Sequence, residues 1–346
     1  MFDTVLKILL FFSTLAYMPG QSLFIFEQKF FPFCVMILVM ASFNAVKQRE
    51  VNFNLLIGLN TVFLINTILH KFNPFVLAYT SNIFLLSLVV YIVASYTKNF
   101  KSCIKWILAS FVLSSAVLLL QLKGYSFFLS SLAEDSGGMM GNLPRLSFLA
   151  CIAFPLALNS RLNWLFVPIV LASCLIVFPQ YCLVAVIGLI VFIKSKRSFT
   201  KTLLLLLAVT VLLFVLVKKP DSVFLRIGYY TPIISDLFSK YLWTGFGAGK
   251  PFASDIGHRD MQIYSSILQF IFCTGISGAI WFCFMCNKFY RSFRVTALNL
   301  SIAGLIFISI WEYPFEVKRL WFLIGSLIGF LIIENKEKNQ CINEKI

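Results

Sequence analysis

The chain has 346 residues, of which 60% are apolar and 12% are charged, and its mean hydropathy is +0.89. Soluble domains are nearer half apolar and a quarter charged, so this composition excludes a soluble enzyme and indicates a membrane protein. The apolar residues form long unbroken runs rather than short alternating segments. We therefore expect an all-α fold, a polytopic transmembrane helical bundle, and not a β-barrel.

The apolar runs predict twelve membrane spans, since a span needs roughly 20 apolar residues. They are 5–25, 30–46, 53–70, 74–96, 104–122, 146–159, 163–178, 180–194, 202–217, 262–286, 296–312 and 318–333. The first is interpreted as a retained helix, because no cleavage pattern of a signal peptide follows it. If Phe178, Pro179 and Gln180 lie in one bent helix, the count becomes eleven. We expect residues 1–346 to form a single membrane domain.

The loop charges indicate how the chain is oriented, because Lys and Arg accumulate on the cytoplasmic side. With the N-terminus inside, the twelve spans place 17 basic and five acidic residues on the inner side, against 12 basic and nine acidic residues on the outer side. Both termini are therefore predicted to be cytoplasmic. Contacts with anionic lipid headgroups account for the net charge of +15, so it indicates no nucleic-acid partner.

Two outer loops, 123–145 and 218–261, are long, and long loops in compact proteins are often functional. In the second, Thr231 followed by Pro232 is a plausible helix start. Five apolar residues then recur at helical spacing: Ile233, Ile234, Leu237, Phe238 and Tyr241. This pattern predicts an amphipathic helix that lies along the outer membrane face or folds over a cavity.

The predicted amphipathic helix is followed by the sequence W-T-G-F-G-A-G at residues 243–249. Gly245, Gly247 and Gly249 permit a positive φ and close backbone approach, so consecutive amides could converge on an anionic group. A helix cap with a tight turn explains the same glycines equally well.

Four features follow one another between residues 137 and 280. They are Gly141 and Asn142 before an apolar helix that contains Pro155, Arg226 at the start of the large outer loop, the W-T-G-F-G-A-G turn, and G-I-S-G at 275–278. This order resembles the O-antigen ligase and polymerase superfamily, membrane enzymes that join glycans carried on undecaprenyl diphosphate. The resemblance implies a bacterial inner membrane location, periplasmic outer loops, and an undecaprenyl-diphosphate-linked oligosaccharide and membrane lipid as partners. It also implies a chain-length regulator and a flippase as further partners.

The chemistry of glycan transfer identifies candidate side chains in the outer loops. Arg or Lys stabilises a diphosphate leaving group, and the attacking hydroxyl needs a general base. The candidate catalytic residues are His258, Asp260 and Arg226, with Asp255 as an alternative base. The candidate substrate-binding residues are Arg145, Arg259, Lys250, Gly245, Gly247, Gly249, Tyr230 and Trp243. Ordinary roles compete with these, such as a helix start for Arg145, a solvated loop for His258 and membrane anchoring for the aromatic residues. We expect no metal and no cofactor, because the acidic loop residues lack a clustered ligand pattern.

We therefore expect a membrane glycosyltransferase, a polysaccharide polymerase that joins lipid-linked repeat units. An O-antigen ligase that transfers the glycan to lipid A core is the alternative. Ligases often have His-Asn where this chain has Tyr264 and Ser265, and this departure favours the polymerase. A flippase or transporter is a third interpretation, but spans three, four, six, seven and nine carry no charged residue away from their ends. His70 fits an interfacial helix end, and Asn66 fits an ordinary interhelical hydrogen bond.

Overall fold

The computed structural model describes residues 1–13, 24–123, 149–150, 152–153, 155–157, 231, 234–235, 237–239, 241–247, 266–293, 296–311 and 318–343. These residues are mostly helical and include no strand, which confirms the all-α class for this part of the chain. The helices are α1 (Phe2–Ser13), α2 (Phe24–Phe43), α3 (Asn54–Leu69), α4 (Pro74–Tyr96), α5 (Phe100–Leu122), α12 (Ser266–Ser292), α13 (Ala297–Trp311) and α14 (Lys318–Asn343). The predicted segments 163–178, 180–194 and 202–217 lie outside the described residues.

Three described helices are long and apolar enough to cross a membrane. They are Pro74–Tyr96, Phe100–Gln121 and Ile267–Arg291. Shorter apolar helices cover Phe30–Phe43, Asn54–Leu69 and Ala297–Ile306. These helices support a membrane protein, while the number of twelve spans stays a prediction.

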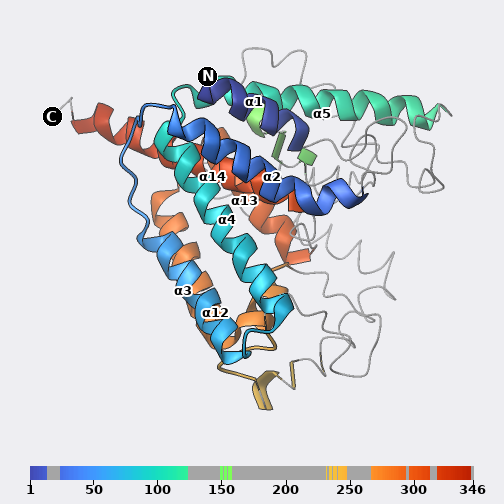
Figure 1. Cartoon of the computed structure of the whole chain (residues 1–346), viewed down its shortest axis with the longest axis vertical. Helices are drawn as coiled ribbons and strands as arrows, with labels where there is room; N and C mark the ends of the chain where they lie inside the picture. The colour runs from blue at the N-terminus through green and yellow to red at the C-terminus, as the bar shows by residue number, and fades with distance from the viewer. Residues whose placement is uncertain are drawn as a thin grey trace, which may run out of the picture.

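The core is built around α14, which crosses α4 and also packs against α1, α2 and α13 (Figure 1). Gly325 and Gly329 are four residues apart on α14 and therefore share a face. A Cβ at Gly329 would lie 2.8 Å from Cγ1 of Val93, and one at Gly325 would lie 3.0 Å from Cγ1 of Val89. The two glycines let α14 approach α4 closely, as small residues four apart do between membrane helices.

Local capping explains where two of the helices begin. The Asn73 side chain accepts a hydrogen bond from the backbone N–H of Phe75 at 3.0 Å, and Pro74 occupies the first turn of α4. The predicted segment 74–96 therefore coincides with α4. Helix α5 begins at residue 100 instead of the predicted 104, because Asn99 accepts the N–H of Ser102 at 3.1 Å and caps the helix earlier.

Other predicted helix boundaries are also wrong, and in α2 and α14 the reason is that polar residues continue the helix beyond its apolar run. Helix α2 begins at residue 24. Residues 24 and 25, predicted as the end of segment 5–25, therefore belong to α2, and the predicted start of segment 30–46 is six residues too late. Helix α14 runs ten residues past the predicted end at 333. The apolar run of α14 is followed, and that of α2 is preceded, by Glu, Gln and Lys. These residues are good helix formers.

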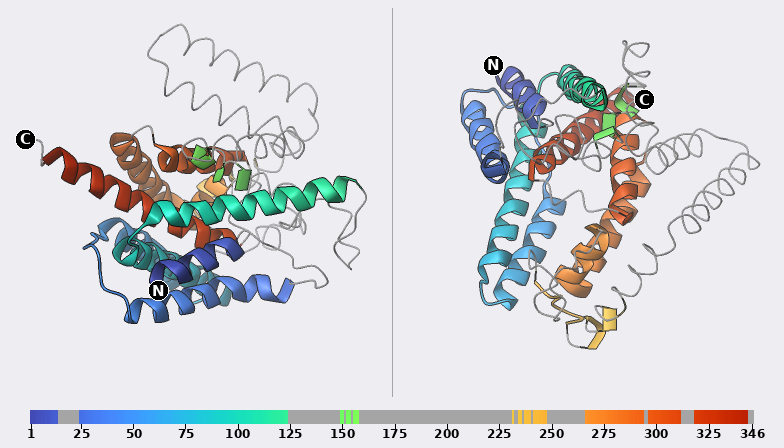
Figure 2. Two further views of the ribbon diagram at one scale, coloured as in Figure 1. Left: turned by 90° about the horizontal axis from the view of Figure 1, so that it is seen from above. Right: turned by 90° about the vertical axis from the view of Figure 1, so that its right-hand side faces the viewer.

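The described helices are not all aligned with one another. Helix α5 runs crosswise to α3 and α4, with α1 packed beside it (Figures 1 and 2). A single membrane normal therefore cannot run along both α4 and α5. The segment 146–159 is helical at its described positions, and Ser301 of α13 donates to the carbonyl oxygen of Ile152 at 2.9 Å.

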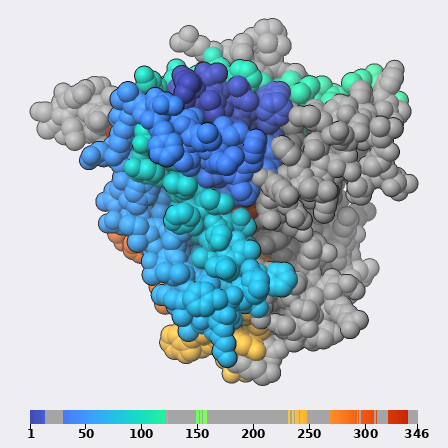
Figure 3. All heavy atoms as spheres, in the orientation of Figure 1, coloured from blue at the N-terminus to red at the C-terminus, as the bar shows by residue number. Residues whose placement is uncertain are grey.

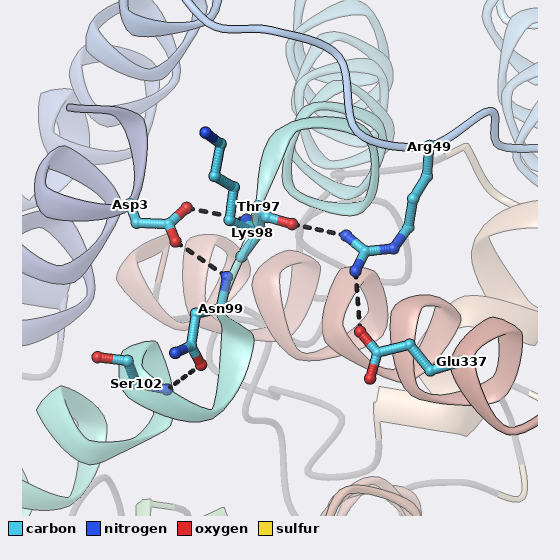
Figure 4. Close-up of polar contacts among 7 residues, drawn as sticks. All are labelled: Asp3, Arg49, Thr97, Lys98, Asn99, Ser102 and Glu337. Atoms are coloured by element: carbon cyan, nitrogen blue, oxygen red, sulfur yellow. Dashed lines mark hydrogen bonds and ion pairs between the residues drawn. The ribbon is translucent and has the colours of Figure 1, made fainter.

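Polar contacts join the ends of several helices at the end of the molecule where α4 meets α5 (Figure 4). The carboxylate of Asp3 accepts the backbone N–H groups of Lys98 and Asn99 at 3.1 and 3.0 Å. These bonds tie the N-terminus of α1 to the loop between α4 and α5.

A second set of contacts at the same end is made by Arg49. Its guanidinium donates to the carbonyl oxygen of Thr97 at 2.6 Å and pairs with Glu337 of α14 at 2.8 Å. Asp3, Arg49, Thr97 and Glu337 all belong to segments predicted to lie on the inner side. These four residues therefore lie together at one end of the molecule, while the assignment of this end to the cytoplasm stays a prediction.

Candidate functional site at the break in helix α12

Helix α12 is interrupted at Gly275, which has φ 66° and ψ −152°. This conformation is essentially restricted to glycine, because it places a Cβ against the backbone. An uninterrupted helix would pair the N–H of Ile276 with the carbonyl of Phe272. The break removes such bonds, so the freed groups need other partners, above all inside a membrane.

The turn at residues 241–247 supplies those partners. The N–H groups of Phe246 and Gly247 donate to the carbonyl oxygens of Phe272 and Cys273 at 2.8 and 3.1 Å. In return, the N–H of Ile276 donates to the carbonyl oxygen of Leu242 at 2.8 Å. Three backbone hydrogen bonds therefore dock the turn into the break.

The docking requires glycine on both sides of the contact. A Cβ at Gly245, whose φ is 64°, would collide with the carbonyl group of Cys273. A Cβ at Gly275 would lie 2.6 Å from the nitrogen of Gly245 and 2.7 Å from the carbonyl oxygen of Leu242. Backbone atoms cannot rotate away, so two main chains meet here at a distance that no side chain allows.

Asn66 of α3 holds the turn and the break together. Its Nδ2 donates to the carbonyl oxygen of Thr244 at 2.7 Å and to that of Cys273 at 3.1 Å. The residue is 3% exposed. Because hydrogen bonds in an apolar, buried setting do not compete with water, this amide fixes the relative position of the turn and the broken helix.

His70, at the C-cap of α3, contacts the same turn. Its Nε2 lies 3.5 Å from the carbonyl oxygen of Thr244, the outer limit of a hydrogen bond. A Cβ at Gly247, whose φ is 98°, would lie 3.2 Å from Cγ and Nδ1 of His70. The imidazole therefore packs directly against Gly247.

The docked turn lies at the lower end of α3 and α4 (Figures 1 and 3), and large aromatic side chains lie in it and just before it. Trp243 is 71% exposed and Phe238 is 66% exposed. Phe246 is buried and its ring packs on Tyr241, with centroids 4.8 Å apart. The turn thus combines a fixed backbone with an exposed indole, an arrangement suited to stacking on a sugar face or to membrane contact.

Three of the predicted site residues lie in this structural unit. Gly245, Gly247 and Trp243 are brought together with the G-I-S-G segment at 275–278. The remaining candidates lie outside the described residues: Arg145, Arg226, Tyr230, Gly249, Lys250, His258, Arg259 and Asp260. So do loop 123–145 beyond residue 123 and much of loop 218–261, although the described positions between 231 and 239 are helical.

The backbone amides of the turn have a role other than the anion cradle considered from the sequence. The N–H of Gly245 donates to the carbonyl oxygen of Tyr241 at 2.8 Å, and those of Phe246 and Gly247 donate to α12. All three amides are engaged by carbonyl oxygens. Gly245 and Gly247 therefore fix the backbone that positions the side chains beside them.

The sequence reasoning missed Asn66 and His70 as parts of the site. The two residues are four apart at the C-terminal end of the apolar helix α3, so they lie on one face. Two polar residues on the same face near a helix end were the available signal. Their partners could not be predicted, because Thr244 and Cys273 are more than 170 residues away in the chain.

Comparisons with known proteins add no assignment to this geometry. No family model matches the chain, and no curated protein matches it.

Proposed function

We propose that the protein is a polysaccharide polymerase that joins undecaprenyl-diphosphate-linked repeat units at the periplasmic face of a bacterial inner membrane. The observation that supports the proposal most directly is the docking of the W-T-G-F-G turn into the break of α12. Two motifs that resemble the superfamily are about thirty residues apart in the sequence, yet they form one unit in space.

In the proposed reaction, a sugar hydroxyl of the acceptor unit attacks the anomeric carbon of the donor glycan. The new glycosidic C–O bond forms as the bond between that carbon and the diphosphate oxygen breaks, and undecaprenyl diphosphate leaves. His258 or Asp260 takes the hydroxyl proton, and Arg226 stabilises the charge on the leaving diphosphate. Arg145, Arg259 and Lys250 are proposed as further contacts to the lipid-linked substrate.

Trp243 is proposed to position the glycan. Its indole is largely exposed, while the hydrogen bonds on either side of it fix the backbone. An aromatic ring held in this way binds a sugar face with little loss of conformational entropy, because the ring is already in place.

The proposal is tested by the length distribution of the surface polysaccharide in cells that depend on this protein. Arg226→Ala should leave the protein inserted in the membrane and reduce long-chain polysaccharide to single repeat units. Arg291→Ala is the matched control. This exposed arginine lies in the last turn of α12, about four turns beyond the break at Gly275, and its loss should not change the length distribution of the polysaccharide. A wild-type ladder in the Arg226→Ala strain would refute the role of this residue.

The same experiment separates the polymerase from the ligase. Loss of a polymerase leaves single repeat units, some of which are transferred onward to lipid A core. Loss of a ligase instead leaves polymerised chains on the lipid carrier. Separation of carrier-linked material from lipid A-linked material in the deletion strain therefore decides between the two, and polymerised chains on the carrier would contradict our proposal.

A further inference from the structure

The turn between α3 and α4 contains two residues in an unfavourable backbone conformation. Lys71 has φ 53° and Phe72 has φ 55°, and within the described part of the chain no other non-glycine residue has a positive φ. The N–H of Lys71 donates to the carbonyl oxygen of Ile68 at 3.0 Å, and the N–H of Phe72 donates to that of Thr67 at 3.0 Å. This is the hydrogen-bond pattern that ends many helices, in which the position of Lys71 is usually glycine.

Lys71 lies directly beside the candidate site. It follows His70, whose imidazole packs against Gly247 and approaches the carbonyl of Thr244. Thr244 in turn follows the exposed Trp243. The Lys71 side chain is exposed. Residues 66–80 and 241–247, which form this part of the site, contain no other lysine or arginine and no carboxylate, so its charge is not neutralised within them.

A glycine at position 71 would satisfy the helix end without the steric penalty of a Cβ. Strained non-glycine residues of this kind are concentrated at ligand-binding sites, where the side chain performs a task that glycine cannot. Here the side chain offers a cation in a turn whose preceding residue, His70, contacts Thr244, the residue after the exposed Trp243. A ligand that carries a sugar linked to a phosphate matches both groups.

We propose that Lys71 is a further substrate-binding residue, whose ammonium contacts a phosphate oxygen of the polyprenyl-diphosphate-linked glycan while the glycan stacks on Trp243. This inference rests on the proposed function. His70 and Asn66 are positioning residues in this arrangement, because they hold the turn that carries Trp243 next to the end of α3.

The test compares Lys71→Gly with Phe72→Gly in purified protein reconstituted in liposomes. Both variants relieve one positive φ, but only the first removes the cation, so Phe72→Gly is a matched control for the backbone. For Lys71→Gly we expect an unfolding temperature equal to or above that of the wild type. Its KM for the lipid-linked repeat unit should rise about tenfold, the effect of losing one charge-assisted contact. Lys71→Arg should restore most of the affinity.

Three results would overturn the inference. They are an unchanged KM in Lys71→Gly, an equal rise of KM in Phe72→Gly, and a failure of Lys71→Arg to restore the KM. Each result indicates that the charge of Lys71 does not bind the substrate. The source of the phosphate is decided by the lipid composition of the liposomes. An effect that persists in pure phosphatidylcholine supports the substrate diphosphate, whereas an effect that requires phosphatidylglycerol indicates a lipid headgroup and refutes the proposal.

A binding measurement separates this inference from the proposed function. The lipid-linked repeat unit should raise the unfolding temperature of the wild type, because a ligand that binds only the folded state stabilises it, and should raise that of Lys71→Gly much less. If the wild type binds in this Lys71-dependent way but does not join repeat units into polysaccharide, the polymerase proposal fails and the Lys71 contact stands. If the wild type shows no shift, the Lys71 contact is wrong.

Discussion

Replacing Gly275 by alanine should release the docked turn from α12. The alanine Cβ would lie 2.6 Å from the nitrogen of Gly245 and 2.7 Å from the carbonyl oxygen of Leu242, both of which are main-chain atoms. Forcing alanine into this conformation costs about 1–3 kcal/mol. Moving the turn away instead breaks three hydrogen bonds worth about 1 kcal/mol each. The local free-energy loss is thus about 3 kcal/mol at most by either route.

This loss is measured best by hydrogen exchange in detergent or lipid discs. The amides of Phe246, Gly247 and Ile276 form the three docking bonds and should be protected in the wild type. In Gly275→Ala their exchange should become about a hundredfold faster, which corresponds to about 3 kcal/mol. Protection within tenfold of the wild type at these three amides would refute the docking argument.

Gly58→Ala is the matched control for this experiment. Gly58 lies in α3 and faces α12, but the atom nearest to an added Cβ is Nε1 of Trp281 at 3.4 Å, an ordinary contact distance. Alanine also favours the helix by about 0.5–1 kcal/mol over glycine. Exchange at the docking amides should therefore be unchanged in this variant, and its unfolding temperature should be equal or higher.

Three further experiments test other contacts. Asn66→Ala removes one buried amide that bonds two carbonyl oxygens, and the loss of about 2 kcal/mol should make proteolysis within residues 241–247 about thirtyfold faster; an unchanged cleavage rate would contradict its role. Gly329→Ala should lower the stability by about 1–2 kcal/mol by crowding Val93, and a simultaneous Val93→Ala should restore it. In a double-mutant cycle, Arg49 and Glu337 should couple by less than about 1 kcal/mol, since the glutamate side chain is 41% exposed, and a larger value would show that the pair is effectively buried.

The candidate site was only partly accessible from the sequence. Trp243, Gly245 and Gly247 could be identified because glycine and exposed aromatic residues have strong local meaning. Their partners could not be identified in the same way. Asn66 bonds Thr244 and Cys273 only because α3 packs beside α12, and that neighbour relationship depends on the whole arrangement of helices.

The sequence by itself determined the features that depend on neighbouring residues. The apolar composition dictates membrane helices, because a buried backbone must satisfy its own hydrogen bonds. The start of α4 follows from Asn73 and Pro74 for the same local reason. The continuation of α2 and α14 through polar residues was missed because hydropathy measures burial, whereas the helix itself is maintained by backbone bonding.

The tertiary structure alone decided the break in α12 and the crosswise course of α5. Residues 262–286 have the pattern of one continuous span, since the G-I-S-G segment is compatible with an unbroken helix. The break is stable only because the turn at 241–247 replaces the lost hydrogen bonds. Long-range replacement of this kind leaves no periodic pattern in the chain, because its energy comes from main-chain groups that every residue carries.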